Sequence, residues 1–308
     1  MDILTAPTAL RNWSLASLVA NMALIFTGGL VRVTSSGLGC PTWPQCTAGS
    51  YVPHSASDVH AVIEFGNRLL TFVLVIIAVG TLVAAWKARD DNGAPKRRAR
   101  GLAIAAAAGI PAQAVIGGVS VLTGLNPWVV GAHLVPSIAL VFVCVVLVHE
   151  AMDVRPAPVP TLVRRLVWTL AVTGVLVMLV GAVVTGAGPN SGDGGAARNG
   201  LELVDVARIH SLLVWLTVGL TAATAWLVRK AGRVRPAVHL LLAVEVLQGA
   251  IGYLQYALHL PPGMVAGHML GTALFAASLA NLWWFTRPAV GVTPAMPGVN
   301  GTTAATSV

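Results

Sequence analysis

Polar side chains interrupt the apolar stretches of this chain, and their types indicate buried acid–base or redox chemistry. The segment "HAVIEFGNRLL", residues 60–70, places His60, Glu64 and Asn67 at spacings of four and three positions. In a helix these spacings bring all three side chains to one face. A carboxylate within an apolar run is costly to bury unless it has a role or a firm partner. We therefore expect Glu64 to have a functional role, and we consider an ordinary ion pair with Arg68, one helical turn further on, the weaker alternative.

Three histidines, His133, His210 and His268, stand near the starts of apolar stretches and are candidate ligands. An imidazole at membrane depth usually faces the interior of a helical bundle, although a single one can simply be a hydrogen-bonded interfacial residue. Two inward histidines on facing helices are the arrangement that holds haem iron from both sides. Zinc would need more Cys, His or carboxylate ligands than the chain offers at suitable spacing. We therefore predict that His210 and His268 are the axial ligands of a haem.

An internal repeat relates two of these histidines. Residues 113–133, "QAVIGGVSVLTGLNPWVVGAH", align without gaps on residues 248–268, "QGAIGYLQYALHLPPGMVAGH", at a constant offset of 135. The alignment pairs His133 with His268. A site built in one half of the chain should therefore have a counterpart at the same depth in the other half.

A weaker match lays "EFGNRLL" over "ARIHSLL", which sets Asn67 opposite His210. Together the matches predict two four-helix halves, residues 1–155 and 156–287, followed by a disordered tail, residues 288–308, that is rich in Gly, Thr, Ala and Pro. Because each half would cross the membrane an even number of times, the halves would be parallel repeats related by an axis along the membrane normal.

Arginines and cysteines gather near one predicted side of the membrane. Arg32, Arg68 and Arg208 lie near helix ends, where guanidinium groups could pair with haem propionates or simply extend to lipid headgroups. Cys40 and Cys46 lie in the first loop of the same side, in "GLGCPTWPQC". An extracytoplasmic compartment permits disulfides, and the intervening prolines favour a tight turn. We predict a Cys40–Cys46 disulfide, either structural or redox-active.

The elements that must position these residues are membrane spans. The chain has 308 residues, of which 56% are hydrophobic and 10% are charged, with a mean hydropathy of +0.79, a balance that excludes a water-soluble domain. Apolar runs of about 20 residues are predicted at 13–33, 62–84, 102–123, 130–149, 166–186, 208–228, 237–257 and 265–285. Small residues within these runs suit close helix packing rather than a β-barrel. The predicted fold is therefore an all-α membrane protein with eight transmembrane helices.

The basic residues orient these spans. Most of them fall at the N-terminus, after even-numbered spans, or at the C-terminus, which places those segments and both termini in the cytoplasm of a plasma-membrane protein. A basic rim facing anionic lipid accounts for the net charge of +8, so no nucleic-acid partner is needed. The first span lacks a cleavage site of small residues, and we expect it to be retained rather than removed as a signal peptide.

The ordered set "GGLVRVTSSGLGCPTWPQC", "IEFGNRLL", "GAHLVPS", "VVTGAGP", "ARIHSLL" and "GHMLGTAL" resembles the haem A synthase family. The resemblance extends to about residue 287 and implies oxidation of the C8 methyl group of haem O to the formyl group of haem A, which terminal oxidases use. It also implies a haem b held by His210 and His268, a substrate haem ligated by His133, a catalytic Glu64 and an extracytoplasmic cysteine pair. The implied partners are a haem O synthase and an electron donor.

One position departs from the family's pattern. Many members have Glu-x-x-His-Arg in the second span, whereas this chain has Asn67 before Arg68. The iron of the substrate haem would then have His133 alone and a position open for oxygen, or His60 would take the missing place. An open position suits an oxidation, while two strong axial ligands suit electron transfer.

We hypothesise that the haem b relays electrons to the substrate haem and that Glu64 handles protons or stabilises charge near the reacting methyl group. Two other functions would use the same histidines. A b-type cytochrome would pass electrons without needing Glu64, and a haem carrier would need no redox chemistry. The sequence also leaves open whether the protein acts as a monomer or a homo-oligomer.

Overall fold

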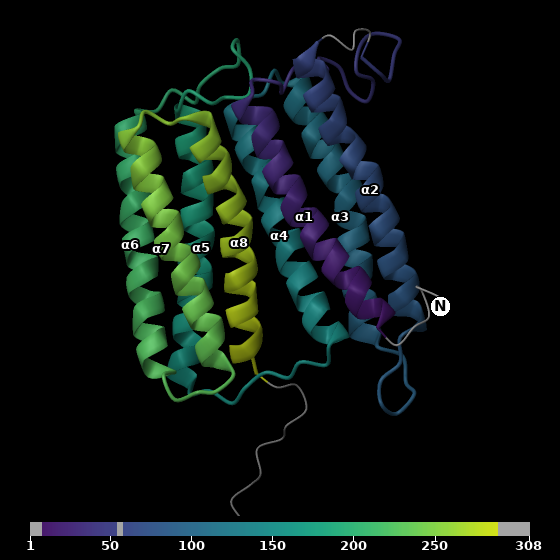
Figure 1. Ribbon diagram of the computed structural model, residues 1–308, viewed down its shortest axis with the longest axis vertical. Helices are drawn as coiled ribbons and strands as arrows, with labels where there is room; N and C mark the ends of the chain where they lie inside the picture. Colours follow the sequence, from purple (N-terminus) through teal and green to yellow (C-terminus); the bar gives the residue numbers. More distant parts are fainter. Residues whose placement is uncertain (1–7, 54–57, 289–308) are drawn as a thin grey trace, which may run out of the picture.

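The computed structural model describes residues 8–53 and 58–288 and contains eight long helices (Figure 1). All eight are long and apolar enough to cross a membrane, which confirms an all-α, multi-pass membrane protein. In chain order the helices are α1 (Ala9–Val33), α2 (Val59–Lys87), α3 (Arg97–Leu122), α4 (Pro127–Ala151), α5 (Thr161–Ala187), α6 (Leu203–Leu227), α7 (Val234–Ala257) and α8 (Pro262–Thr286). The predicted tail from residue 289 onward lies outside the described residues.

Each helix begins a few residues before the apolar run that predicted it, and at α2 and α4 a polar side chain caps the first turn. Asp58 precedes α2, and its carboxylate accepts hydrogen bonds from the backbone N–H groups of His60 and Ala61. Asn126 caps α4 in the same way through the N–H of Trp128. The apolar runs thus mark the membrane-crossing part of helices that extend further at their polar ends.

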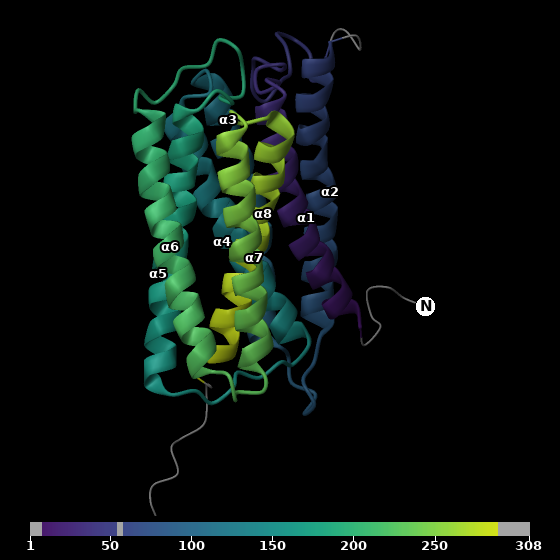
Figure 2. The ribbon, with the colours of Figure 1, turned by 60° about the vertical axis from the view of Figure 1, so that its left-hand side comes forward.

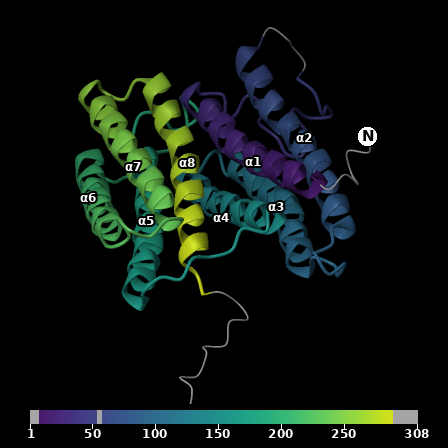
Figure 3. The same ribbon diagram turned by 60° about the horizontal axis from the view of Figure 1, so that its bottom comes forward.

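The helices form two groups of four, side by side (Figure 3). In the first group α1, α2, α3 and α4 contact one another in a closed ring, and in the second group α5, α6, α7 and α8 do the same. The predicted boundary at residue 155 falls in the segment that connects α4 to α5. Among the described helices, α2 and α4 lie diagonally within one ring, and α6 and α8 lie diagonally within the other. That the rings are symmetry-related repeats stays a prediction.

Helix α8 joins the two groups through contacts with α1 and α4, and it is the most buried of the eight spans (Figure 1). Its aliphatic side chains pack with those of α5 and α7 in the largest apolar cluster, which includes Leu170, Leu241 and Leu282, each with no exposed surface. Small residues allow this close approach. A Cβ atom added at Gly174 would lie 2.7 Å from the Leu279 side chain.

The longer loops lie at one end of the bundle, and there they interlock the two groups (Figure 2). Arg32, near the end of α1, donates hydrogen bonds from Nε to the Asn190 carbonyl at 2.6 Å and from Nη2 to the Thr185 carbonyl at 3.1 Å. The Gly37 N–H donates to the Gly192 carbonyl at 2.8 Å. The loop after α1 is therefore held against the loop after α5, which fixes the two groups relative to each other at this end.

Candidate functional site

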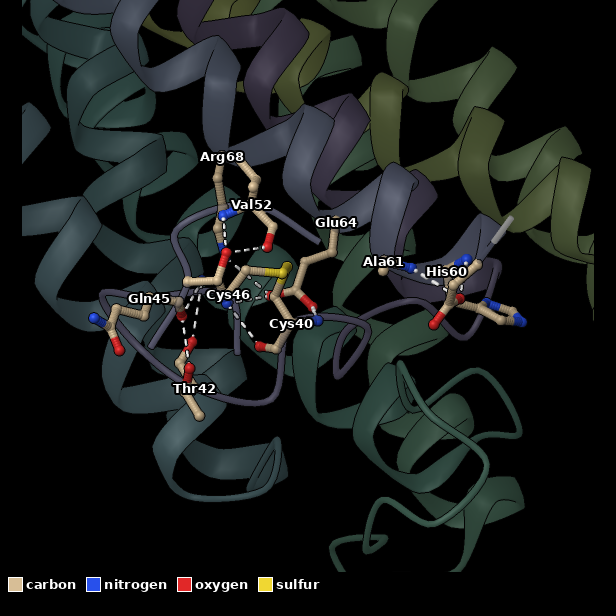
Figure 4. Close-up of a disulfide and its surroundings, with 11 residues drawn as sticks. Cys40, Thr42, Gln45, Cys46, Val52, His60, Ala61, Glu64 and Arg68 are labelled. Carbon is tan, nitrogen blue, oxygen red and sulfur yellow. Dashed lines mark hydrogen bonds and ion pairs between the residues drawn. A yellow bond between two sulfur atoms is a disulfide. The ribbon is translucent and has the colours of Figure 1, made fainter. Parts of the chain in front are cut away.

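The Cys40–Cys46 loop lies against the first turns of α2, where Glu64 and Arg68 are found (Figure 4). The predicted disulfide is present, with an S–S distance of 2.07 Å, and both cysteines are buried. The Cys40 N–H donates a hydrogen bond to Glu64 Oε2 at 2.6 Å. The loop and the predicted catalytic carboxylate therefore form one structural unit.

Arg68 holds this unit together. Its Nη2 lies 2.6 Å from Glu64 Oε1 and 2.8 Å from the Cys40 carbonyl oxygen. Its Nη1 donates to the carbonyl oxygens of Thr42 and Gln45, at 3.1 and 3.2 Å. One guanidinium group thus satisfies three loop carbonyls and the carboxylate, as its planar array of donors allows.

The ion pair that we considered the weaker alternative is thus made. Glu64 is only 5% exposed, so its charge is stabilised by Arg68 and by the Cys40 N–H rather than by water. The pair and a catalytic role are compatible. One carboxylate oxygen accepts from the backbone and the other from Arg68, so the carboxylate is fixed in orientation, which a positioned acid–base group requires.

The other residues predicted for the first half have different surroundings. His60 lies at the second residue of α2, and its Nδ1 is 3.0 Å from Ser36 Oγ, so it faces the loop after α1. Asn67 Oδ1 and His133 Nδ1 are buried, and neither has a hydrogen-bond partner among the described residues. Unsatisfied buried polar atoms are uncommon in proteins. Asn67 on α2 and His133 on α4 belong to the diagonal helices of the first ring and could hold a polar or metal-bearing ligand.

In the second half, His210 on α6 and His268 on α8 face each other across the diagonal of the ring. Their ring centroids are 6.5 Å apart, with planes inclined at 75°. Both Nδ1 atoms are buried without a hydrogen-bond partner among the described residues. The sequence prediction that these two histidines come together at one depth is therefore met by the geometry.

This pair fits the requirements of a haem iron. A transition-metal ion lies about 2 Å from an imidazole nitrogen, so an ion shared by two imidazoles sets their centroids about 6 Å apart. The observed separation of 6.5 Å is compatible with one iron between His210 and His268. Within the described residues, no group of three or more His, Cys, Asp or Glu side chains is placed to hold a metal. In the second ring, the pair is thus the candidate iron site.

Glycines make room for the histidine rings in both halves. A Cβ atom at Gly252 of α7 would lie 3.4 Å from His268 Cε1, and one at Gly117 of α3 would lie 3.7 Å from His133. These two glycines are equivalent in the sequence repeat. The offset was visible in the sequence, but only the packing of the helices reveals that each glycine borders the histidine of its own half.

The three arginines predicted to pair with propionates differ in availability. The guanidinium groups of Arg32 and Arg68 already bind backbone carbonyls or a carboxylate. Arg208 is exposed, and its only ion pair among the described residues is a long one, 3.7 Å from Asp205. Arg208, two residues before His210, is thus the arginine with most free donors. The sequence did not predict the contacts of Arg32 and Arg68 with backbone carbonyls, because these contacts depend on how the loops fold back.

A second buried carboxyl lies deeper in the second half. Glu245 of α7 is 5% exposed, and its Oε1 accepts a hydrogen bond from Thr221 of α6 at 2.8 Å. Its Oε2 has no partner among the described residues. This carboxyl group links α7 to α6 through its hydrogen bond with Thr221 and is separate from the unit formed by Glu64 and the disulfide loop.

The fold and the site together define a class: a polytopic helical membrane protein that holds a histidine pair suited to haem in one ring of helices and a fixed carboxylate in the other. Comparison with known families identifies which one. Residues 11–201 match the family COX15-CtaA, described as cytochrome oxidase assembly protein, and the chain belongs to this family.

The names of individual relatives are consistent with this family. A protein named heme A synthase from Listeria welshimeri is 28% identical over 182 residues, which cover 57% of this chain and 58% of that protein. A protein of the same name from Lysinibacillus sphaericus is 31% identical over 182 residues, which cover 57% of this chain and 57% of that protein. Another from Symbiobacterium thermophilum is 30% identical over 188 residues, which cover 57% of this chain and 59% of that protein. The matches thus span somewhat more than half the length of each relative.

The family match includes all of the first ring, together with α5 and the loop that follows it. It ends before His210 and His268. Glu64, its disulfide loop and His133 thus lie within the matched residues, whereas His210 and His268 lie beyond them.

Proposed function

We propose that this protein is a haem A synthase, which oxidises the C8 methyl group of haem O to a formyl group. The observation that carries the proposal is the facing pair of His210 and His268, in a chain whose first 201 residues include the match to this family. The pair supports haem binding, and the relatives named heme A synthase indicate the reaction. The product haem A comes from those names, whereas haem O as substrate and oxidation of its C8 methyl group are what the family resemblance implies.

In this proposal the second ring carries the resident cofactor. A haem b held between His210 and His268 would supply one-electron transfer, for which two axial histidines are suited. The two residues would hold the iron from diagonal helices, α6 and α8. Gly181 and Gly252 leave space beside their rings, since a Cβ atom at Gly181 would lie 3.1 Å from His210 Cε1. Arg208 is the residue we assign to a propionate.

The first ring receives the substrate haem O. His133 would hold its iron, and Asn67 occupies the sequence position at which many members of the family have a second histidine. A side-chain amide is a much weaker iron ligand than imidazole, so one position stays available for oxygen chemistry. The unsatisfied Nδ1 of His133 and Oδ1 of Asn67 support this assignment.

Glu64 acts beside the substrate, at the outer mouth of the first ring. Its carboxylate is fixed by Arg68 and by the Cys40 N–H, so it can accept or donate a proton without first being ordered. Because Arg68 also holds the disulfide loop, a change in that loop would alter the position of Glu64. Arg68 is therefore a positioning residue in this proposal, and Glu64 is the catalytic one.

The reaction is tested by extracting pigments from cells that make haem O but no haem A, with and without this protein. The proposal predicts that haem A appears only when the protein is expressed. A b-type cytochrome would instead add haem b and leave haem O unchanged. A carrier would change the amount or location of haem O without converting it. Either of these results would overturn the proposal.

A further inference from the structure

The turn between α6 and α7 carries cations that lack an acidic partner. Residues 226–240, "WLVRKAGRVRPAVHL", contain three arginines and one lysine but no aspartate or glutamate. The described residues do form ion pairs at this end of the bundle, but those join Lys96 to Asp153, and Glu150 to both Arg98 and Arg287. Among the described residues, the cations of the α6–α7 turn therefore keep a positive charge that no acidic side chain compensates.

These cations surround a hollow rather than a flat surface. The hollow has a volume of about 450 Å³. The α6–α7 turn, which contributes its lining, lies at the end of the bundle opposite the loop after α1 (Figure 1). The hollow is lined by Arg229, Lys230, Gly232, Arg235, Pro236 and His239. The lining contains no carboxylate. A Cβ atom added at Gly232 would have no neighbouring atom within 4 Å, so this side of the hollow is open.

The hollow lies at the level of lipid headgroups. Trp226, at the end of α6, is 68% exposed, and Leu240, in the second turn of α7, is 51% exposed. Exposed tryptophans of membrane proteins mark the boundary between acyl chains and headgroups. The Arg229 guanidinium lies 4.5 Å from the centre of the Trp226 ring and donates to its backbone carbonyl at 2.8 Å. A cation is thus held at the boundary, beside apolar surface that acyl chains would cover.

The acidic side chain of the neighbouring hollow, Asp153, does not neutralise this site. Asp153 lines a neighbouring hollow together with Arg233. Its carboxylate, however, already binds Lys96. The positive charge that remains in the α6–α7 hollow would therefore attract an anion from outside the protein.

We propose that the α6–α7 hollow binds the phosphate-bearing headgroup of an anionic phospholipid. Arginine forks bind phosphate oxygens through paired hydrogen bonds, and basic pockets between spans are suited to anionic headgroups. The adjoining exposed apolar surface at Trp226 and Leu240 favours a lipid over a free anion, because only a lipid would cover both. This site is separate from the haem sites and does not depend on the proposed function.

The test is lipid retention by the full-length protein in a neutral detergent, measured by native mass spectrometry during titration with phosphatidylglycerol or phosphatidylcholine. We expect phosphatidylglycerol to be retained and phosphatidylcholine to be lost. Each basic residue near an anionic lipid contributes about fivefold in affinity. The variant Arg229→Gln/Arg235→Gln should therefore bind phosphatidylglycerol about 25-fold more weakly.

The matched control is Arg164→Gln/Arg165→Gln, which removes two cations at the start of α5 but none from the hollow. This control should bind as the wild type does. Equal losses in both double variants would mean a general charge effect and would overturn the site. Inorganic phosphate should not displace the lipid, and efficient displacement would mean a site for a free anion instead. If the double variant melts early, Arg235→Gln alone should weaken binding about fivefold, and unchanged binding would refute the proposal.

Discussion

Removal of the Arg68 side chain should destabilise the outer part of the first ring. The variant Arg68→Ala loses five hydrogen bonds, two to Glu64 and three to the carbonyls of Cys40, Thr42 and Gln45. It also leaves Glu64, which is 5% exposed, without its cation. Breaking a buried ion pair from one side costs about 3–5 kcal/mol. Because the Arg68 side chain is 22% exposed, we expect the lower end, about 3 kcal/mol.

The effect is measurable as a melting temperature in detergent, followed by tryptophan fluorescence or circular dichroism. For a protein of this size a loss of about 3 kcal/mol corresponds to a decrease of roughly 6–12 °C. The control is Arg198→Ala, at the same end of the bundle, where an exposed arginine makes a hydrogen bond to the Pro189 carbonyl. This control should shift the melting temperature by no more than about 2 °C.

A melting temperature for Arg68→Ala equal to that of the control would refute the role of Arg68 in holding the loop. A double-mutant cycle with Glu64→Gln separates the pair from the loop contacts. If the ion pair contributes, Arg68→Ala should cost less in the Glu64→Gln background than in the wild type, because no uncompensated carboxylate then remains. Simple additivity of the two changes would show that the pair is not coupled.

Three further predictions concern the histidine sites and the disulfide. The change Gly252→Leu should remove haem b from the purified protein, since even a Cβ atom lies 3.4 Å from His268 Cε1; full haem b absorbance in the reduced spectrum would contradict the packing. The change Asn67→His should supply a second axial ligand in the first ring, raising the low-spin haem signal in electron paramagnetic resonance and lowering haem A yield; an unchanged yield would argue against an open coordination position. Replacing Cys40 and Cys46 by Ser should lower the free energy of unfolding by about 2 kcal/mol, as expected for so short a loop, and an unchanged thermal melt would show that the disulfide adds no stability.

The membrane spans could be predicted from the sequence because a span depends mainly on local properties. Length and hydropathy decide it, and the side chains of Asp58 and Asn126 cap α2 and α4 ahead of their apolar runs. The facing of His210 and His268 was also predictable, because a four-helix ring leaves few places for two histidines at one depth. The family resemblance agreed with both.

The contacts of the arginines could not be predicted in the same way. Arg32 and Arg68 lie near helix ends, and one prediction from the sequence was that they pair with haem propionates. Their actual partners are backbone carbonyls of loops, such as those of Asn190 and Thr42, whose positions depend on tertiary packing. The i, i+4 spacing of Glu64 and Arg68 did indicate their ion pair, but burial led us to consider it the weaker alternative. The disulfide loop explains why Glu64 and Arg68 are both buried and paired, since the loop covers the ion pair and satisfies its remaining hydrogen bonds.

The central claim is that the two rings divide the work, with electron transfer at the histidine pair and oxidation at Glu64. The most direct measurement is the haem content of purified Glu64→Gln, expressed in cells that make haem O and compared with the wild type. The account predicts that the variant retains haem b with an unchanged reduced spectrum and yields no haem A. Wild-type haem A content in this variant would contradict the claim, as would loss of haem b together with haem A.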